Sequence, residues 1–175
     1  MTKNIILGGG CFWCTEAIFN KVKGIEKVVP GYTGGKTLDP TYKDICTGIT
    51  GHAEVVSIDY DNQIIALEDI LEIFFDTHDP TTLNRQGNDL GTQYRSSIFL
   101  SHVEEIKIVS DFIKLLESSK KFKNKILTTI EEKNIFYEAE NYHHDYYENN
   151  KSAPYCTMVI SPKVEKFKKN SVFLK

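Results

Sequence analysis

Three consecutive glycines, Gly8 to Gly10, separate two apolar stretches near the beginning of the chain and constrain its fold more than any other feature. The stretch 3–9, which includes the first two of these glycines, has the length and apolar character of a short buried strand. From residue 12 to residue 22, apolar side chains recur at helical spacing. Because glycine permits a tight turn and a close approach of the backbone, we expect Cys11 to lie where a strand turns into a helix.

The rest of the chain continues this alternation of strands and helices. Alternating or short apolar runs predict further strands at 24–29, 52–61, 95–100 and 126–132. Amphipathic or capped patterns predict helices at 67–78, 101–116, 139–150 and 163–170. Ser101 and Glu104 are spaced as a capping box, and the inner stripe of that helix is predicted to contain Val103, Ile106, Phe112, Ile113 and Leu116. The length of 175 residues and this pattern indicate one α+β domain over 1–175, with helices packed mainly on one side of a sheet.

Composition excludes several classes of protein. With 41% hydrophobic and 26% charged residues, the chain is typical of a globular protein. Its net charge is −3 and its charges are interspersed, which argues against a nucleic-acid partner. No stretch approaches the roughly 18 apolar residues of a membrane span, and the first residues lack a signal-peptide core. We therefore expect a monomer in the cytoplasm, where thiols stay reduced.

Two long segments, 30–52 and 77–95, are poor in aliphatic residues and rich in Gly, Thr, Asp and Pro. Structureless connections longer than about 12 to 15 residues are uncommon in a compact domain and are usually functional. We expect both segments to converge on the glycine turn and to form a site there.

Cys11 is the first candidate for chemistry at that site. A thiol at the N-terminal end of a helix faces unpaired N–H groups and the helix dipole, which predicts a lowered pKa and a nucleophilic thiolate. Phe12 and Trp13 follow it directly. An aromatic pair beside a nucleophile can line an apolar pocket, although aromatic residues in a helix are often ordinary core.

Glu54 is a candidate proton donor. It begins the strand in which Val56 and Ile58 alternate with polar residues. If it shares their face, burial raises its pKa and keeps it protonated near neutral pH; otherwise it is a surface glutamate at the end of a strand.

Three loop residues could complete a polar site. Tyr42 and Tyr94 carry phenols that can donate hydrogen bonds to an oxygen atom, although loop tyrosines are usually only packed. Asp89 lies between Asn88 and Leu90 in a glycine-bounded stretch that is typical of a turn.

The remaining cysteines and histidines leave alternatives open. Cys11 and Cys14 form a C-x-x-C, which is also typical of a thioredoxin-like dithiol. A structural zinc site is weakly supported, because Cys46 and Cys156 do not form a second such pair. The adjacent residues His143 and His144 are expected to serve a polar surface or capping role.

Several strings in this sequence resemble the peptide methionine sulfoxide reductase A family. GGGCFWC, GYTGG, PTY, TGHAE, HDPT, RQGNDLGTQYRS and AENYH occur in the order and near the spacings of that family, over residues 7–162. The resemblance implies a thiol-dependent oxidoreductase that reduces the S epimer of methionine sulfoxide, free or in oxidised proteins. It also implies a two-layer α+β fold with a mixed or antiparallel sheet, a split β-α-β (ferredoxin-like) core and long functional loops.

The same resemblance implies roles for individual residues. Cys11 would be the nucleophile, Glu54 would be the general acid, and Tyr42 and Tyr94 would donate hydrogen bonds to the sulfoxide oxygen. Asp89 would help to fix the polar part of the site. Phe12 and Trp13 would form the walls around the methyl group of the substrate. Attack by the thiolate needs donors on the sulfoxide oxygen, since oxide is a very poor leaving group. Methionine departs and Cys11 remains as a sulfenic acid, which a second thiol condenses to a disulfide. By resemblance, thioredoxin then restores the enzyme, and no metal or organic cofactor is required.

This chain departs from the family pattern at its other thiols. Cys14 stands where the family often has glycine, and the family's glycine-rich tail with two cysteines is replaced by SAPYCTMVISPK, with Cys156 alone. We favour Cys156 as the resolving thiol, carried by a C-terminal segment, 151–175, able to move to the site; Cys14, one helical turn from Cys11, is the alternative. A general dithiol oxidoreductase using Cys11 and Cys14, a methionine sulfoxide-binding module and a zinc-held interaction domain are the rival functions.

Overall fold

The computed structural model describes all residues, 1–175, and contains one large sheet of six strands. The strand order is β7-β6-β1-β3-β2-β8. The strands are β1 (Thr2–Gly9), β2 (Ile25–Thr33), β3 (Ala53–Asp61), β6 (Ser96–Leu100), β7 (Thr129–Glu132) and β8 (Tyr137–Glu138). All neighbouring pairs are antiparallel except β6 and β7, so the sheet is mixed, as predicted.

Two β-α-β connections form the centre of the fold. β1 and β2 are both antiparallel to β3 and therefore run parallel to one another on either side of it. Helix α1 (Phe12–Phe19) connects them. Helix α3 (Leu67–Thr77) lies on the path from β3 to β6, which run parallel on either side of β1. Each connection therefore has a third strand between its two parallel strands.

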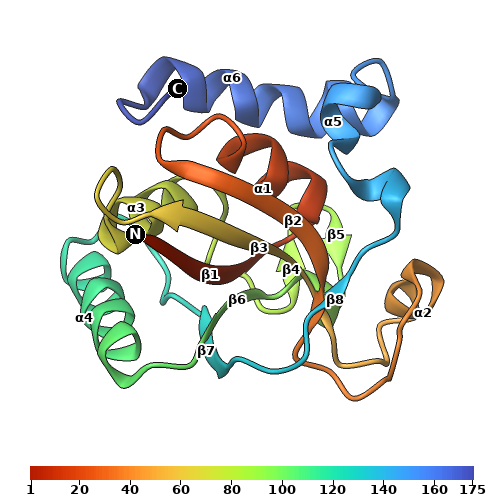
Figure 1. The fold of residues 1–175 in the computed structure, drawn as a ribbon, viewed down its shortest axis with the longest axis horizontal. Coiled ribbons are helices and arrows are strands. Elements are labelled where there is room, and N and C mark those ends of the chain that lie inside the picture. Colours follow the sequence, from red (N-terminus) through yellow and green to blue (C-terminus); the bar gives the residue numbers. More distant parts are fainter.

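The helices form a second layer. In Figure 1, α1 lies across the sheet, α5 (Tyr146–Asn149) and α6 (Ser161–Asn170) lie beyond it, and α4 (Val103–Ser118) and α2 (Tyr42–Cys46) lie at opposite ends of the molecule. The main core is formed where α1 and α3 meet the sheet, and a small separate cluster of Ile6, Ala53, Val55 and Phe99 lies under Phe136. This two-layer α+β arrangement agrees with the prediction.

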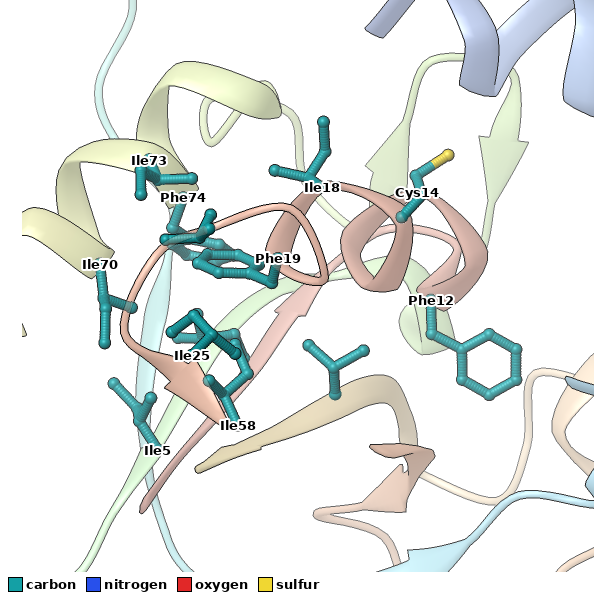
Figure 2. Packing of buried hydrophobic residues seen from close by; sticks show 14 of the residues in the cluster. Ile5, Phe12, Cys14, Ile18, Phe19, Ile25, Ile58, Ile70, Ile73 and Phe74 are labelled. Atoms are coloured by element: carbon teal, nitrogen blue, oxygen red, sulfur yellow. The ribbon is translucent and has the colours of Figure 1, made fainter. Parts of the chain in front are cut away.

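Helix α1 begins directly after the glycine turn and spans the core. Phe19 packs at its far end near Phe74 of α3, while Phe12 and Cys14 lie at the end nearest the turn (Figure 2). The alternation predicted for β3 is confirmed, because Val56 and Ile58 are buried while Ser57 is only partly buried. The core therefore holds both the helix that follows Cys11 and the strand that begins near Glu54.

Two helix predictions were wrong in detail. Helix α4 begins after His102 without a side-chain cap, so the predicted capping box is absent. Its first predicted core residue, Val103, is 77% exposed, and Val109 is the residue that is buried instead. The segment 139–150 is not one helix: a 3-10 turn, Asn141–His143, is separated from α5 by Asp145, whose φ of 51° is left-handed.

The two segments predicted as loops contain short regular elements. Residues 30–33 continue β2, and α2 lies within 34–52. The second segment forms a hairpin of β4 (Arg85–Gln86) and β5 (Asp89–Leu90), followed by the 3-10 turn η1 (Thr92–Tyr94). Near the C-terminus, the π-helical turn η3 (Cys156–Ile160) runs directly into α6. Aliphatic residues are too few in these segments for periodicity to reveal such short elements.

Candidate active site

The glycine turn brings Cys11 to the beginning of α1. Gly10 has a φ of 92°, in the left-handed region that favours glycine, and a Cβ there would lie 2.6 Å from the Cβ of Gln86. Cys11 is the residue before the first turn of α1 and is only 7% exposed. The predicted strand-to-helix junction is therefore present, and the turn needs its glycine for both conformation and space.

Glu54 lies against that junction from the neighbouring strand. It is 1% exposed, and its Oε1 accepts a hydrogen bond of 3.2 Å from the N–H of Phe12. Its Oε2 is buried and has no hydrogen-bond partner. Burial is the main cause that raises the pKa of Glu54 to about 8, and the charge of Asp89 adds to the rise. At neutral pH, Glu54 is therefore a protonated acid with one oxygen unoccupied.

Tyr42 and Tyr94 surround the same carboxyl. Tyr42 is the first residue of α2, and Tyr94 ends η1. Burial, and next the charge of Glu54, raise the pKa of both phenols above their ordinary value. The Thr92 hydroxyl donates to the carbonyl of Gly48 at 3.2 Å, which ties the two predicted loop segments together. Both phenols therefore stay protonated and remain hydrogen-bond donors.

The pKa of the Cys11 thiol is raised, which contradicts the prediction that the helix terminus lowers it. Burial is the main cause, and the neighbouring Cys14 thiol and the charge of Glu54 add to it. The helix terminus does not compensate, because the N–H of Phe12 is already bound to Glu54 and the N–H of Cys14 is bound to the Cys11 carbonyl. Only the N–H of Trp13 acts to lower the pKa. An anionic Glu54 and an anionic Cys11 therefore disfavour one another.

Asp89 belongs to this region through a tyrosine that the sequence did not indicate. The Tyr155 hydroxyl donates to Asp89 Oδ2 at 2.7 Å and lies 4.0 Å from the Cys14 sulfur. Tyr155 immediately precedes Cys156, which is fully buried in η3. Cys11, Cys14 and Cys156 share one buried cluster, all four cysteines are free thiols, and Cys46 is exposed.

The aromatic residues after Cys11 differ in exposure. Phe12 is completely enclosed by Tyr32 and His143, with ring centroids 5.6 and 5.0 Å away. Trp13 is only partly buried, and its ring stacks on Tyr146 at 3.7 Å with an interplanar angle of 8°. Trp13 therefore presents the accessible aromatic surface, and Phe12 supports it from behind.

His143 was expected to serve a polar surface or capping role and is instead buried against the site. Its Nδ1 accepts a hydrogen bond of 3.0 Å from the Trp13 indole N–H. Burial lowers the pKa of His143 to about 4, so its ring is neutral at pH 7. His144 lies nearby and binds the Ala139 carbonyl at 3.1 Å. Only the tertiary fold brings residue 143 to residue 13, so neither periodicity nor composition could have indicated this contact.

Glu140 was also missed. One of its carboxylate oxygens accepts from the Tyr32 hydroxyl at 3.0 Å and the other from the N–H of Tyr42 at 2.9 Å. These hydrogen bonds lower the pKa of Glu140, against the effect of burial. The start of α2, and with it Tyr42, is thereby fixed to the sheet.

A hollow outside this site lies in another part of the molecule. It has a volume of about 930 Å³ and is lined by α3, residues 121–124 and α6. It reaches the back of the glycine turn at His78 and Gln86 but includes none of the predicted site residues.

None of the helices combines the length and the apolar character that spanning a lipid bilayer requires.

Known proteins match this chain over nearly its whole length. The family model of peptide methionine sulfoxide reductase matches residues 3–174. Peptide methionine sulfoxide reductase MsrA of Saccharolobus solfataricus is 57% identical over 163 residues, which cover 93% of this chain and 91% of that protein. MsrA of Nitratiruptor is 53% identical over 167 residues, which cover 95% of this chain and 95% of that protein.

Solved structures agree in fold. Reduced Mxr1 from Saccharomyces cerevisiae matches with a TM-score of 0.79 and 34% identity, over 89% of each chain. Mxr1 in complex with Trx2 matches with a TM-score of 0.56 and 26% identity, over 83% of this chain and 84% of that one.

Proposed function

Because this chain belongs to the peptide methionine sulfoxide reductase family, we propose that it reduces the S epimer of methionine sulfoxide, free or in oxidised proteins, through Cys11. The observation that carries this proposal is the buried carboxyl of Glu54. It is neutral at pH 7, it is bound to the first N–H of the helix that follows Cys11, and its second oxygen is free. A neutral acid beside a thiol is the arrangement that sulfoxide reduction needs.

The chemistry explains that need. The Cys11 sulfur attacks the electrophilic sulfur of the sulfoxide, and the S–O bond can break only if the oxygen receives a proton or strong hydrogen bonds. Glu54 supplies the proton as general acid, and the phenols of Tyr42 and Tyr94 donate hydrogen bonds to the oxygen. In net terms, a thiol and a sulfoxide become a sulfenic acid on Cys11 and a thioether, methionine.

Binding of the substrate is assigned to the surrounding side chains. Trp13, supported by Phe12, forms the wall against the methyl group of the substrate. Asp89 fixes the polar side of the site through Tyr155. Both assignments rest on the contacts of these side chains and on the family to which the chain belongs.

The sulfenic acid is resolved by a second thiol. We assign this step to Cys156, which releases water and forms a disulfide with Cys11. Cys156 is fully buried in η3, so the step requires the segment 151–175 to move. Cys14 is the alternative, favoured by the direct interaction of its thiol with that of Cys11. Thioredoxin then reduces the disulfide, a partner suggested by the relative that was solved with Trx2.

Turnover of the two separated epimers with a dithiol reductant tests the proposal. We expect reduction of the S epimer alone, and loss of turnover in Cys11→Ser. A general dithiol oxidoreductase would instead reduce insulin disulfides and show no preference between epimers, and that result would overturn the proposal.

The resolving thiol is tested by a single turnover without reductant, followed by alkylation and peptide mapping. A disulfide between Cys11 and Cys156 is expected in the wild type, and the variant Cys46→Ser is the matched control. A peptide joining Cys11 to Cys14 would reverse the assignment.

We also propose that the protein acts as a monomer in the cytoplasm. A compartment that keeps thiols reduced suits a chain with four free cysteines and no disulfide. Sedimentation of the reduced protein at micromolar concentration should give the mass of one chain, 20.0 kDa.

A further inference from the structure

A second buried glutamate, Glu16, lies on α1 one helical turn beyond Trp13. It is 2% exposed, and its Oε2 accepts a hydrogen bond of 3.1 Å from the N–H of Asp145. The N–H of Tyr146 also donates toward the same carboxyl, which lowers the pKa of Glu16 against the effect of burial. A carboxyl buried this completely is stable only where such donors replace water, so its position is determined by the main chain at residues 145 and 146.

The main chain that Glu16 holds has an unusual conformation. Asp145 has a φ of 51°, which is uncommon for a residue other than glycine. Its side chain accepts a hydrogen bond of 3.3 Å from Asn20, the residue that directly follows α1, four positions after Glu16. Glu16 and Asn20 therefore fix both the backbone and the side chain of the residue that precedes α5.

The first residue of α5 contacts Trp13, the side chain assigned to the wall against the methyl group of the substrate. Tyr146 stacks flat on Trp13 at 3.7 Å, and His143, before the same turn, accepts the indole hydrogen bond. The flat stacking contact and the hydrogen bond of the indole thus come from the two sides of the turn at Asp145, while Tyr155 packs edge-on against it from another segment. If this turn shifts, the stacking contact and the hydrogen bond shift with it.

We propose that Glu16 is a positioning residue that sets the orientation of the Trp13 indole by holding the turn at Asp145 and the start of α5. This inference rests on the proposed role of Trp13 as the wall around the substrate methyl group. Glu16 acts through Trp13 and does not touch the reacting atoms. Its loss therefore weakens substrate binding more than the chemical step.

The experiment uses the fact that Trp13 is the only tryptophan of the chain. In Glu16→Gln, one of the two carboxyl oxygens is replaced by an NH₂ group, which leaves fewer acceptor positions for the N–H groups of Asp145 and Tyr146. We expect the emission of Trp13 in the reduced protein to change in wavelength and intensity. We also expect the KM for methionine sulfoxide to rise about threefold to tenfold, with kcat within about twofold of the wild type.

Two companion variants make the result specific. Tyr146→Leu should change the emission and the KM in the same direction, and the effects of the two variants should be less than additive when they are combined, because both act on the stacking contact of Trp13. Glu68→Gln, an exposed acid in the first turn of α3, is the matched control and should change neither.

A fall in kcat and in melting temperature with unchanged Trp13 emission would overturn the proposal and leave Glu16 a merely structural residue. Additive effects in the double variant would overturn it as well. If Glu16→Gln does not fold, the conservative variant Glu16→Asp, whose shorter side chain cannot reach both N–H groups, is measured in the same way. If even the wild type fails to reduce methionine sulfoxide, the proposed function fails, while the emission of Trp13 still decides the positioning role.

Discussion

Glu54 and Glu16 are both almost completely buried, and each accepts a hydrogen bond from the main chain where a helix begins. The donor is Phe12 for Glu54, at 3.2 Å, and Asp145 for Glu16, at 3.1 Å. Burial raises the pKa of both acids, to about 8 and about 7. They differ in their hydrogen bonding: Oε2 of Glu54 is buried without a hydrogen-bond partner, whereas Glu16 has no buried oxygen that lacks one. Burial raises the pKa at both places, and only the unoccupied oxygen makes one of the two acids available to a substrate.

The strongest test of this difference replaces each acid by its amide. Glu54→Gln should lower kcat for methionine sulfoxide by about 100-fold to 10,000-fold, the usual contribution of a general acid, while Glu16→Gln changes kcat by about twofold or less. The assay is turnover of the S epimer, and alkylation of Cys11 by iodoacetamide verifies that the site is intact. Equal losses in the two variants would mean that the free oxygen of Glu54 has no special role.

The phenols around Glu54 should have the next largest effect. Tyr42→Phe and Tyr94→Phe each remove one donor to the sulfoxide oxygen, and each should lower kcat by about 10-fold to 100-fold. Tyr60→Phe, a buried tyrosine in the core at the far end of β3, is the control and should leave kcat nearly unchanged. If the single variants are as active as this control, Glu54 works without the phenols.

The pH dependence separates the acid from the thiol. The reactive form holds one proton on Glu54 and none on Cys11, so it belongs to the singly ionised pair. The population of this form rises about tenfold per pH unit until the pH reaches the lower pKa of the pair, which lies near the value of about 8 for Glu54. It falls again only above the higher pKa of the pair, which reflects the raised pKa of Cys11. We therefore expect kcat/KM to rise with pH below 8.

In Glu54→Gln, the rising limb of kcat/KM should move to higher pH, because only the raised pKa of Cys11 then controls it. A wild-type kcat/KM that falls as pH rises through 8 would show instead that the form with both protons reacts.

Thermal stability gives the smallest effect. Between pH 6.5 and 8 an unfolded glutamate is already ionised, whereas Glu54 in the folded protein still holds its proton. The folded state therefore binds more protons, and stability falls as pH rises through this window, by roughly 2 kcal/mol for Glu54. Calorimetry should show a wild-type melting temperature a few degrees lower at pH 8 than at pH 6.5. A smaller decrease is expected in Glu54→Gln, and an identical decrease would contradict the raised pKa.

The sequence predicted the parts of the site that depend on local pattern. The glycine run located Cys11 at the start of α1. The alternation along β3 left open whether Glu54 is buried with Val56 and Ile58 or exposed at the end of the strand, and in the structure it is buried. The direction of the Cys11 pKa shift was wrong, because local reasoning cannot show that the thiol is buried, which is the main cause of the rise, or that Glu54 occupies the N–H of Phe12.

The residues that the sequence missed are held by long-range contacts. His143 binds a side chain 130 positions earlier, and Glu140 binds a backbone N–H 98 positions earlier. Neither contact leaves a periodic or compositional signal. The same is true of the left-handed turn at Asp145, which interrupts a segment whose composition suggested one continuous helix.

The distance along the chain between Cys11 and its surroundings has a consequence for biosynthesis. The thiol is synthesised more than 120 residues before the side chains from Glu140 to Tyr155, which hold Trp13, Tyr42 and Asp89 in place around the site. Contacts of such high sequence separation form late, since a long loop must close first. A nascent chain therefore carries an ordinary, accessible thiol on the ribosome, and the reactive environment is completed only after residues 140–155 have been made and have docked.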